Sequence, residues 1–525
     1  MRRQTYSIFN DVIGPVMTGP SSSHTAGPSK IGFLARHLLG SEPQSVTFTF
    51  NEGGSFAASF DSQGTDRGLT GGMLGFRPDD LRMLDALKEA KNAGLHVEFR
   101  TAHFAADHPN TVIIHAHGKD GDEAQCRGIS VGGGMIIVQE INGFPVCLNG
   151  KSWELLVFAE AADQMQSCRD MIYKESDKAT PEVIKKSSSS LIRCSLTHEP
   201  EKALIRSLRS IAACVRVLPP VFPILDQPEE NVPFRTGSEM LSWAEKEHLT
   251  PGQAGLYYEA AKGGTTPEEV MKIAFEVLDI METGIRENLV SKRPGRLIKA
   301  CSGDYTQKSG SAQLIDLGAA DRIIAYSMAM VERNSYYKTI VAAPTCGACG
   351  TVPGTILGIA DYTGVNREKR AMALLAAGAI GLLIADQATF AAEIAGCQAE
   401  CGAASAMAAA AAVELMGGTV LEAQEAASLA LQNVLGLICD SVANLVEVPC
   451  LGRNVMGGVN AAACANMVMA GARCVIPVDE TIQSMLAVGN LMPPELCCTN
   501  NGGLAITKTS LELAEKIRLY GTAVS

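Results

Sequence analysis

Hydrophobic and polar positions follow two different patterns, one in the first 150 residues of this chain and another after residue 235. Between Ser45 and Phe50, apolar side chains alternate with hydroxyl side chains, which is typical of a strand. Further strands are predicted over residues 95–99, 111–117 and 129–139, and a helix over residues 79–93. We therefore expect residues 1–150 to form an α/β domain.

The second half of the chain is dominated by Ala, Leu, Met and Glu, with glycines between the helical stretches. This pattern predicts a tightly packed all-α domain over residues 236–525. The intervening residues 151–235 are less defined, and we expect a linker or helical insert there. Lys185–Ser190 is the best linker candidate, because serines and lysines follow one another without apolar positions.

One stretch, residues 371–396, is long and apolar enough to cross a bilayer. Asp386, Gln387 and Glu393 interrupt it, and Ala and Gly supply most of its apolar positions. Buried core helices are therefore expected rather than a membrane span.

Composition narrows the class of protein. Of the 525 residues, 46% are hydrophobic and 19% are charged, which is a globular composition. The net charge of −12 disfavours a nucleic acid or an anionic membrane as partner. The N-terminus shows no signal peptide, so we expect a cytoplasmic protein whose 16 cysteines stay reduced. Eleven of them follow residue 300, which points to the second half for any cysteine chemistry.

Three motifs carry candidate chemistry. Ser21-Ser22-Ser23-His24-Thr25 lies between glycines and prolines and suits an anion such as a carboxylate, although a polar helix cap would look the same. Ser130 and Val131 precede three glycines, which allow either close approach of a ligand or a simple bulge.

The cysteines form the third motif. Cys346 with Cys349, and Cys397 with Cys401, are close pairs, whereas Cys439 and Cys450 stand alone. Spacing does not choose among these six, and packing of small buried residues is the alternative to a metal or cluster site.

Taken together, the sequence resembles the iron–sulfur-dependent L-serine dehydratases (L-serine ammonia-lyases), with a β region followed by an α region in one chain. Matching stretches in the β region are residues 13–15, 21–25, 64–66, 108–111 and 130–134. Matching stretches in the α region are residues 343–345, 396–400, 436–440, 446–450, 453–454 and 502–505.

The resemblance implies a [4Fe–4S] cluster held by Cys397, Cys439 and Cys450, with one iron open to substrate. It implies β-elimination of L-serine to pyruvate and ammonia, an oxygen-sensitive activity of amino-acid metabolism and gluconeogenesis. In this view Cys346, Cys349 and Cys401 are core residues or neighbours of the ligands. Like most symmetric oligomers, the protein is expected to be a homodimer.

Site residues are likewise carried over by motif. The expected catalytic residues are Ser21, Ser22, Ser23, His24 and Thr25, with the general base unassigned. The expected substrate-binding residues are Ser130, Gly132, Gly133, Thr65, Asp66, Arg453 and Asn454.

Several positions depart from the family pattern. Gln63 stands where relatives have a histidine, and Cys497-Cys498 stands where many have Arg-Glu. Part of the family places a C-terminal cysteine on the open iron. Here no cysteine follows Cys498, so a cysteine cap is not expected unless Cys497 or Cys498 substitutes for it. Asn142-Gly143-Phe144 resembles the entry to an ACT domain, of which we expect only a remnant or a helical insert.

These departures keep other functions open. A β-eliminase acting on threonine, cysteine or a modified serine is one alternative, and a non-catalytic amino-acid or redox sensor is another. A pyridoxal-phosphate dehydratase is not supported, because we find no lysine in a phosphate-loop context.

Overall fold

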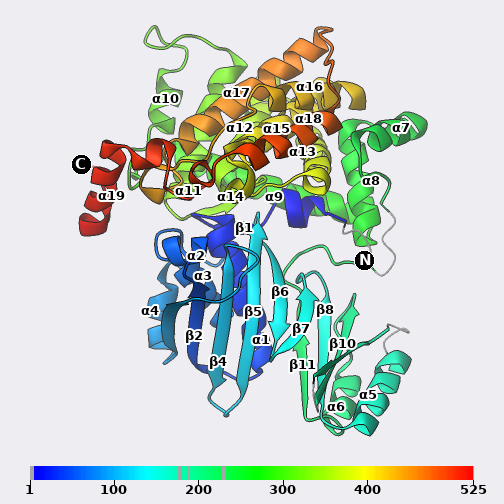
Figure 1. Cartoon of the computed structure of the whole chain (residues 1–525). Helices are drawn as coiled ribbons and strands as arrows, with labels where there is room; N and C mark the ends of the chain where they lie inside the picture. Colours follow the sequence, from blue (N-terminus) through cyan, green and yellow to red (C-terminus); the bar gives the residue numbers. More distant parts are fainter. Residues whose placement is uncertain (1–4, 176–179, 187–188, 228–231, 524–525) are drawn as a thin grey trace. The chain divides into compact units, whose positions relative to one another are not determined.

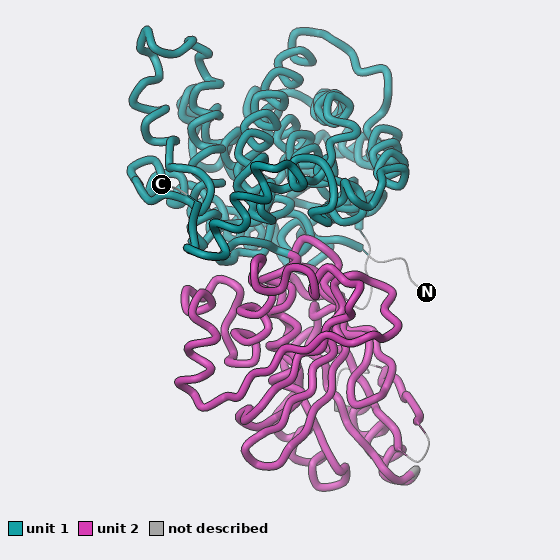
Figure 2. Tube along the Cα trace, turned by 60° about the vertical axis from the view of Figure 1, so that its left-hand side comes forward, with its two compact units in different colours: residues 1–22, 229–525 teal, residues 23–228 magenta. Residues whose placement is uncertain are grey.

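A computed structural model describes residues 5–175, 180–186, 189–227 and 232–523 of the chain. The chain folds into two compact units, which Figure 2 shows in different colours. One unit contains residues 1–22 together with 229–525, and the other contains residues 23–228. The predicted fold class is confirmed: a sheet-rich N-terminal region is followed by a mostly helical C-terminal region (Figure 1).

The unit of residues 23–228 is built around a six-stranded sheet with the order β3-β2-β4-β5-β6-β7. Its strands are β2 (Pro43–Asn51), β3 (His96–Ala102), β4 (Thr111–Gly118), β5 (Glu123–Gly132), β6 (Met135–Ile141) and β7 (Phe144–Leu148). Only β2 and β3 pair in parallel. The predicted strands are confirmed, except that residues 129–139 are divided between β5 and β6 by a turn at the three glycines.

Helices α1 (Gly27–Leu39) and α3 (Thr65–Met73) lie close together beside this sheet. Val46, Phe48 and Phe50 of β2 are buried and share one hydrophobic core with α1 and α3, as their alternation predicts. A Cβ atom at Gly72 would collide with the carbonyl oxygen of Ser29, so a glycine is needed where α3 crosses α1. The shorter helices α2 (Ser55–Ser59) and α4 (Ala86–Asn92) complete this part.

Residues 153–218 form a second, four-stranded antiparallel sheet, which corrects the expected linker or helical insert over residues 151–235. The elements are β8 (Trp153–Ala159), α5 (Ala162–Glu175), β9 (Glu182–Lys186), β10 (Ser189–Leu196), α6 (Lys202–Arg209) and β11 (Cys214–Leu218). The order β11-β8-β10-β9 is a complete βαββαβ topology of the ferredoxin-like kind rather than a remnant.

The sequence misled here for a physical reason. Leu155 and Val157 of β8 pack with α5 and α6, while Leu156 packs in the core of the six-stranded sheet. Both faces of β8 are thus buried, so the alternation that marks a half-exposed strand is missing. The expected linker at Lys185–Ser190 is the hairpin between β9 and β10, where Lys186 pairs with Ser189; residues 187–188 lie outside the described part of the chain.

The other unit is a helical bundle, as expected. Its main helices are α7 (Gly237–Glu247), α8 (Pro251–Gly263), α9 (Pro267–Leu289), α10 (Ser302–Lys308), α11 (Ala319–Ser335), α12 (Thr351–Thr363), α13 (Arg367–Gln387), α14 (Ala392–Ala395), α15 (Cys401–Met416), α16 (Val420–Gln432), α17 (Cys450–Met469), α18 (Val478–Leu491) and α19 (Lys508–Tyr520). Two apolar segments, Arg367–Gln387 and Cys397–Met416, are long enough to span a membrane, but most of each is buried in this unit. They are core helices, and Asp386 at the end of α13 pairs with Arg235.

Residues 5–22 belong to the helical unit rather than to the expected α/β domain of residues 1–150. Strand β1 (Val16–Thr18) pairs with β12 (Thr339–Val341), and Ile8 fills the space beside Gly378 of α13. The buried Glu259 carboxylate of α8 accepts hydrogen bonds from the Ser7 hydroxyl and from the backbone N–H groups of Ile8 and Phe9. These contacts join segments about 250 residues apart in sequence.

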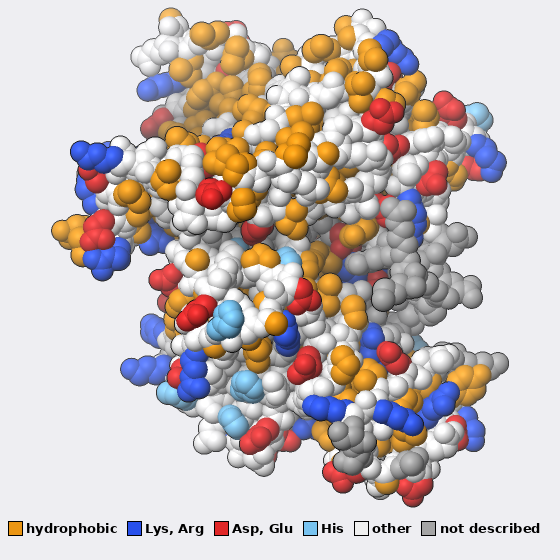
Figure 3. All heavy atoms as spheres, in the orientation of Figure 1, with side chains coloured by type: hydrophobic (Ala, Val, Ile, Leu, Met, Phe, Trp, Pro, Cys, Tyr) orange, Lys and Arg blue, Asp and Glu red, His pale blue; other side chains and the backbone are white. Residues whose placement is uncertain are grey.

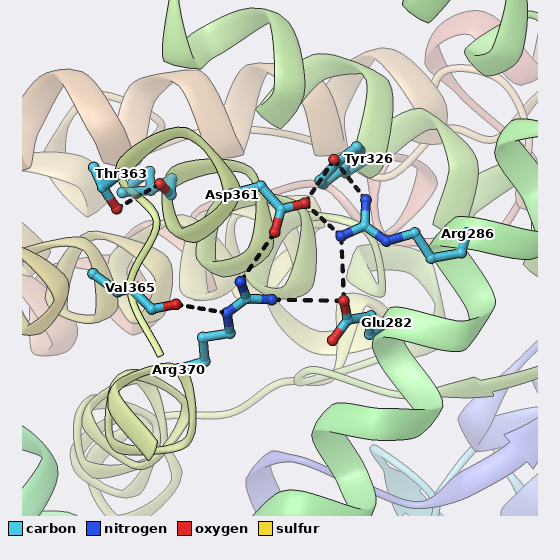
Figure 4. A network of polar contacts seen from close by, with 8 residues as sticks. Glu282, Arg286, Tyr326, Asp361, Thr363, Val365 and Arg370 are labelled. Atoms are coloured by element: carbon cyan, nitrogen blue, oxygen red, sulfur yellow. Dashed lines mark hydrogen bonds and ion pairs between the residues drawn. The ribbon is translucent and has the colours of Figure 1, made fainter. Parts of the chain in front are cut away.

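An ion-pair network holds four helices of the bundle together (Figure 4). Asp361 of α12 accepts hydrogen bonds from Arg286 of α9 and Tyr326 of α11, and pairs with Arg370 of α13 at 3.2 Å. Glu282 of α9 pairs with both arginines, at 3.2 Å and 3.6 Å.

On the face drawn in Figure 3, the described acidic and basic side chains are interspersed over the surface.

Candidate active site

Cys397, Cys439 and Cys450 lie in three segments of the helical unit that meet one another. Cys397 begins a short 3₁₀ turn before α15, Cys439 lies in the loop after α16, and Cys450 is the first residue of α17. All three are buried, and the Cys397 sulfur interacts electrostatically with the other two. The structure therefore brings the three predicted ligands into one neighbourhood.

Gln398 fixes the first of these segments against the second. Its side-chain oxygen accepts from the Gly436 N–H at 2.9 Å, and its side-chain nitrogen donates to the Met485 carbonyl at 2.9 Å. Its backbone N–H donates to the Leu437 carbonyl at 2.9 Å. A fully buried glutamine with all these partners holds the Cys397 turn beside the loop that carries Cys439.

Arg453 connects the second and third segments. Its guanidinium donates to the Ile438 carbonyl at 2.9 Å and to Asp440 Oδ1 at 2.7 Å, so α17 is tied to the loop on both sides of Cys439. A hydrogen bond from Cys401, together with the nearby Arg453 charge, holds the pKa of the Cys397 thiol at about 7. Burial raises the pKa of Cys450. Arg453 is thus a cation beside a thiol that ionises readily.

Asn454, predicted to bind substrate, has partners within the protein for its whole side-chain amide. Its oxygen accepts from the backbone N–H groups of Gly350 and Thr351 at 2.9 Å and 3.1 Å. Its nitrogen donates to the carbonyls of Gly347 and Cys450 at 2.7 Å and 2.9 Å. The geometry makes Asn454 a clamp between the start of α12 and the start of α17.

Glu400 is a residue of this site that sequence reasoning did not single out. It is partly buried next to the cysteine segments, and the Thr345 hydroxyl donates to its Oε2 atom. Burial raises the pKa of the Glu400 carboxyl to about 8, and the nearby Cys397 sulfur acts in the same direction. The motif around Cys397 contains Glu400, but its burial could not be derived from the sequence.

Cys498 lies directly against Cys439. The Cys439 N–H donates to the Leu496 carbonyl at 2.8 Å, and the Cys498 N–H donates to the Cys439 carbonyl at 3.0 Å. A hydrogen bond also links the two side chains. Cys498 has a positive φ of 60°, a left-handed conformation that is uncommon for residues with a side chain.

The remaining cysteines of the two close pairs have other surroundings. The Cys346 sulfur lies 3.1 Å from the Met17 sulfur, and Cys349 lies 3.8 Å from the Met330 carbonyl. These two are core residues. Cys401 is a neighbour of Cys397 and lies 3.8 Å from the Gly347 carbonyl.

The chemistry of the three cysteines fits the donors of an iron–sulfur cluster. Among the described residues, no three His, Cys, Asp or Glu side chains are close enough to hold one metal ion. The ligand sulfurs of a four-iron cluster stand farther apart than those of one ion, and three buried thiols beside a guanidinium supply the soft, charge-compensated donors that iron–sulfur clusters require.

The serine loop runs straight into a helix. Residues Ser22–Ala26 form a π-helical turn, and α1 follows at Gly27. Ser21 and Ser22 belong to the helical unit, where the Ser22 side chain hydrogen-bonds the Cys346 thiol. Ala26, the residue that precedes α1, makes no side-chain capping hydrogen bond.

Ser23, His24 and Thr25 belong to the sheet-containing unit. The Ser23 hydroxyl lies 2.9 Å from His24 Nδ1, and the Ser55 hydroxyl lies 3.0 Å from His24 Nε2. Thr25 donates to the Gln63 carbonyl at 2.8 Å, which places the serine loop beside the start of α3. The imidazole is buried and oriented at both nitrogens.

The same unit brings the other predicted substrate residues towards this loop. Lys30 of α1 donates to the Gly134 carbonyl at 3.0 Å, so the glycine turn lies next to the helix that follows the serine loop. Gly132 and Gly133 have φ of 101° and 59°, which explains glycine there. The buried hydroxyls of Thr65 and Ser130 have no hydrogen-bond partner within the described part of the chain. Burial raises the pKa of Asp66 although Arg67 opposes this.

Comparison with known proteins adds an independent finding. The family described as "Serine dehydratase alpha chain" matches residues 159–505. A probable L-serine dehydratase alpha chain of Bacillus subtilis is 37% identical over 290 residues, which cover 54% of this chain and 95% of the relative. The corresponding probable beta chain of B. subtilis is 44% identical over 151 residues, which cover 29% of this chain and 67% of that relative. L-serine dehydratase TdcG of Escherichia coli is 38% identical over 192 residues, 36% of this chain and 42% of that protein.

Proposed function

This chain belongs to the serine dehydratase family, and on that premise we propose that it is an L-serine ammonia-lyase that converts L-serine to pyruvate and ammonia. Its similarity to both an alpha and a beta chain supports a single chain that carries both regions. The observation that carries the proposal is the buried group of Cys397, Cys439 and Cys450 beside Arg453.

In this proposal Cys397, Cys439 and Cys450 hold a [4Fe–4S] cluster. The bound cluster would supply a Lewis-acidic iron that assists departure of the β-hydroxyl group, because hydroxide is a poor leaving group. Arg453 compensates the thiolate charge and, through Asp440, keeps the Cys439 loop in place. Asn454 positions Cys450 and the start of α12 rather than binding substrate.

The polar residues of the serine loop and of the sheet-containing unit bind the amino acid in this proposal. The hydroxyls of Ser21, Ser22 and Ser23 donate to the carboxylate. Thr65 and Ser130 do so as well, which is supported by their buried hydroxyls, since neither has a hydrogen-bond partner in the residues that the structure describes. His24 donates a hydrogen bond or transfers a proton, and the two serine hydroxyls at its nitrogens set its orientation. Gly132 and Gly133 leave the backbone accessible to the ligand.

A second candidate function is β-elimination from a related amino acid such as threonine, cysteine or a modified serine. It is favoured by Gln63, which is buried at the serine loop where relatives have a histidine. If the side-chain pocket has changed, Gln63→His should raise activity on L-serine sharply. An unchanged L-serine activity in this variant would remove the support for the second function.

Pyruvate and ammonia release after anaerobic reconstitution with iron and sulfide tests both functions. L-Serine is assayed beside L-threonine, L-cysteine and O-substituted serines. The proposed function predicts that L-serine has the highest kcat/KM and that activity decays in air. Turnover of another panel member alone would move the assignment to the second function, and ligand binding without turnover would support a sensor. We also propose that the protein is a cytoplasmic homodimer. Its molar mass, measured by light scattering after size-exclusion chromatography, would check the dimer.

A further inference from the structure

Two buried polar side chains at one end of the six-stranded sheet lack a partner that each of them needs. Asn110 directly precedes β4, and Ser130 lies in β5. Their exposed fractions are 1% and 0%. Asn110 Oδ1 and Ser130 Oγ have no hydrogen-bond partner among the described residues. Native proteins rarely leave buried polar atoms unpaired, and such an atom calls for an explanation such as a functional role or a bound water or ion.

The backbone contacts of the pair define which groups are free. The Ser130 N–H donates to the Asn110 carbonyl at 3.1 Å, and Asn110 Nδ2 donates to the Ser130 carbonyl at 3.3 Å. Because a carbonyl only accepts, the amide group that faces it must be the NH₂ group. The free atom of Asn110 is therefore the oxygen, an acceptor, whereas the free hydroxyl of Ser130 can donate.

We propose that Asn110 and Ser130 together bind the head group of an α-amino acid, Asn110 Oδ1 accepting from its ammonium group and Ser130 Oγ donating to its carboxylate. This assignment rests on the proposed function and adds Asn110 as the residue that recognises the amino group. An α-amino acid carries a cation and an anion on one carbon atom, which matches a free acceptor and a free donor on two linked residues. Gly132, two residues after Ser130 and so on the same face of β5, carries no side chain.

The consequence is selectivity for the amino group. A carboxylic acid without an amino group would leave the Asn110 oxygen unpaired in a buried position, and sites with buried polar groups reject such ligands strongly. L-Alanine and propanoate test this directly. They differ by the amino group alone, and neither has a β-hydroxyl group that could be eliminated.

The experiment measures binding of L-alanine and of propanoate to the reconstituted full-length protein by isothermal titration calorimetry. Asn110→Ala is expected to weaken L-alanine binding by about tenfold or more and to leave propanoate binding within about twofold. Ser130→Ala is expected to weaken both ligands. Asn149→Ala is the matched control, because Asn149 donates to Asp226 at 2.6 Å and has a structural role; this variant should keep the preference for L-alanine.

The melting temperature of the ligand-free variants gives a second readout. Removal of an unpaired buried hydroxyl should leave the melting temperature of Ser130→Ala unchanged or raise it, whereas loss of a purely structural hydroxyl would lower it. The inference is overturned if Asn110→Ala weakens both ligands equally, if it changes neither, or if the wild-type protein does not prefer L-alanine.

The outcome is separable from that of the proposed function, because neither ligand is turned over. Loss of amino-group selectivity in Asn110→Ala would support the inference even in a protein that does not act on L-serine. Normal L-serine turnover with unchanged selectivity in Asn110→Ala would overturn the inference and leave the proposed function standing.

Discussion

The role of Cys498, a residue that departs from the family pattern, can be inferred only from its position in the structure. By the family resemblance, a Cys-Cys pair stands where many relatives have Arg-Glu, and residues 499–525 contain no cysteine. In the structure the Cys498 side chain hydrogen-bonds that of Cys439, a proposed cluster ligand. Its neighbour Cys497 is buried, whereas Cys498 is partly exposed. The contact supports Cys498 as the thiol that stands in for a tail cysteine.

We expect Cys498→Ser to lose iron faster than the wild-type protein when the reconstituted enzyme is exposed to ferricyanide. A thiol beside a ligand sulfur protects the neighbouring iron, and a serine hydroxyl is a poorer donor to iron, so the loss should be about tenfold faster. Iron content and the electron paramagnetic resonance signal of a three-iron cluster measure this. Cys474→Ser is the control. Equal rates of iron loss in all three proteins would show that Cys498 has no part in the cluster site.

The residues of the site differ in how far the sequence could reveal them. The cysteine motifs and the serine loop are short local patterns. The structure places the three predicted ligand cysteines in the helical unit, and it places Thr25 against the Gln63 carbonyl in the other unit. Asn454 was expected to face substrate, but its amide is occupied by the protein. Asn110 was missed because its role is inferred from a contact between distant residues. Its side-chain nitrogen donates to the carbonyl of Ser130, 20 residues away, and this contact leaves its side-chain oxygen without a partner among the described residues.

Charged side chains stabilise this fold through ion pairs that join different helices of the bundle. Asp361 of α12 contacts Arg286, Tyr326 and Arg370 from three other helices (Figure 4). Burial alone would raise the pKa of the Asp361 carboxyl, but hydrogen bonds from Arg286 and Tyr326 outweigh it and lower this pKa below its ordinary value of 3.8. The charged form of Asp361 is therefore favoured by folding.

Asp361→Asn should lower the free energy of unfolding by about 2 kcal/mol at pH 7, since solvent partly screens the half-exposed Arg286. The wild-type contribution is present above the ordinary pKa and is lost as pH falls through the lowered pKa of the folded state. The difference between variant and wild type should therefore shrink in acid. Denaturant titrations at several pH values measure it, with the exposed Asp279→Asn as control. A difference that grows in acid would contradict this assignment.

Elements were predictable where one face of a strand or helix meets solvent. The alternation in β2 and the helical period of the second half are of this kind, and the structure confirms both. The four-stranded sheet could not be recognised, because Leu155 and Leu156 point into different cores on opposite faces of β8. Burial on both faces removes the pattern on which the prediction depends.

The division of the whole molecule could not be derived from sequence position, because its first segment packs with its second half. Ile8 is fully buried between helices α8 and α13, where a Cβ atom at Gly255 or Gly378 would approach it closely. Such contacts join residues far apart in sequence, which local patterns do not encode.

Ile8→Ala should therefore destabilise the helical unit by about 2–4 kcal/mol through loss of buried contacts and the cavity left behind. Hydrogen exchange should become faster in α8 and α13 and stay unchanged in β2 of the other unit. Ile394→Ala, at an exposed position, serves as the control. Faster exchange throughout both units, or no change in α13, would contradict the assignment of residues 1–22 to the helical unit.

The central claim is that Cys397, Cys439 and Cys450 hold the cluster on which L-serine turnover depends. The most direct measurement is iron content together with pyruvate release from L-serine, made on anaerobically reconstituted wild type, Cys439→Ala and Cys464→Ala. Cys464 is a buried cysteine of α17 outside the proposed ligand set, so it is a matched control. We predict that Cys439→Ala loses both iron and turnover while Cys464→Ala keeps both. Full iron content and turnover in Cys439→Ala would contradict the account.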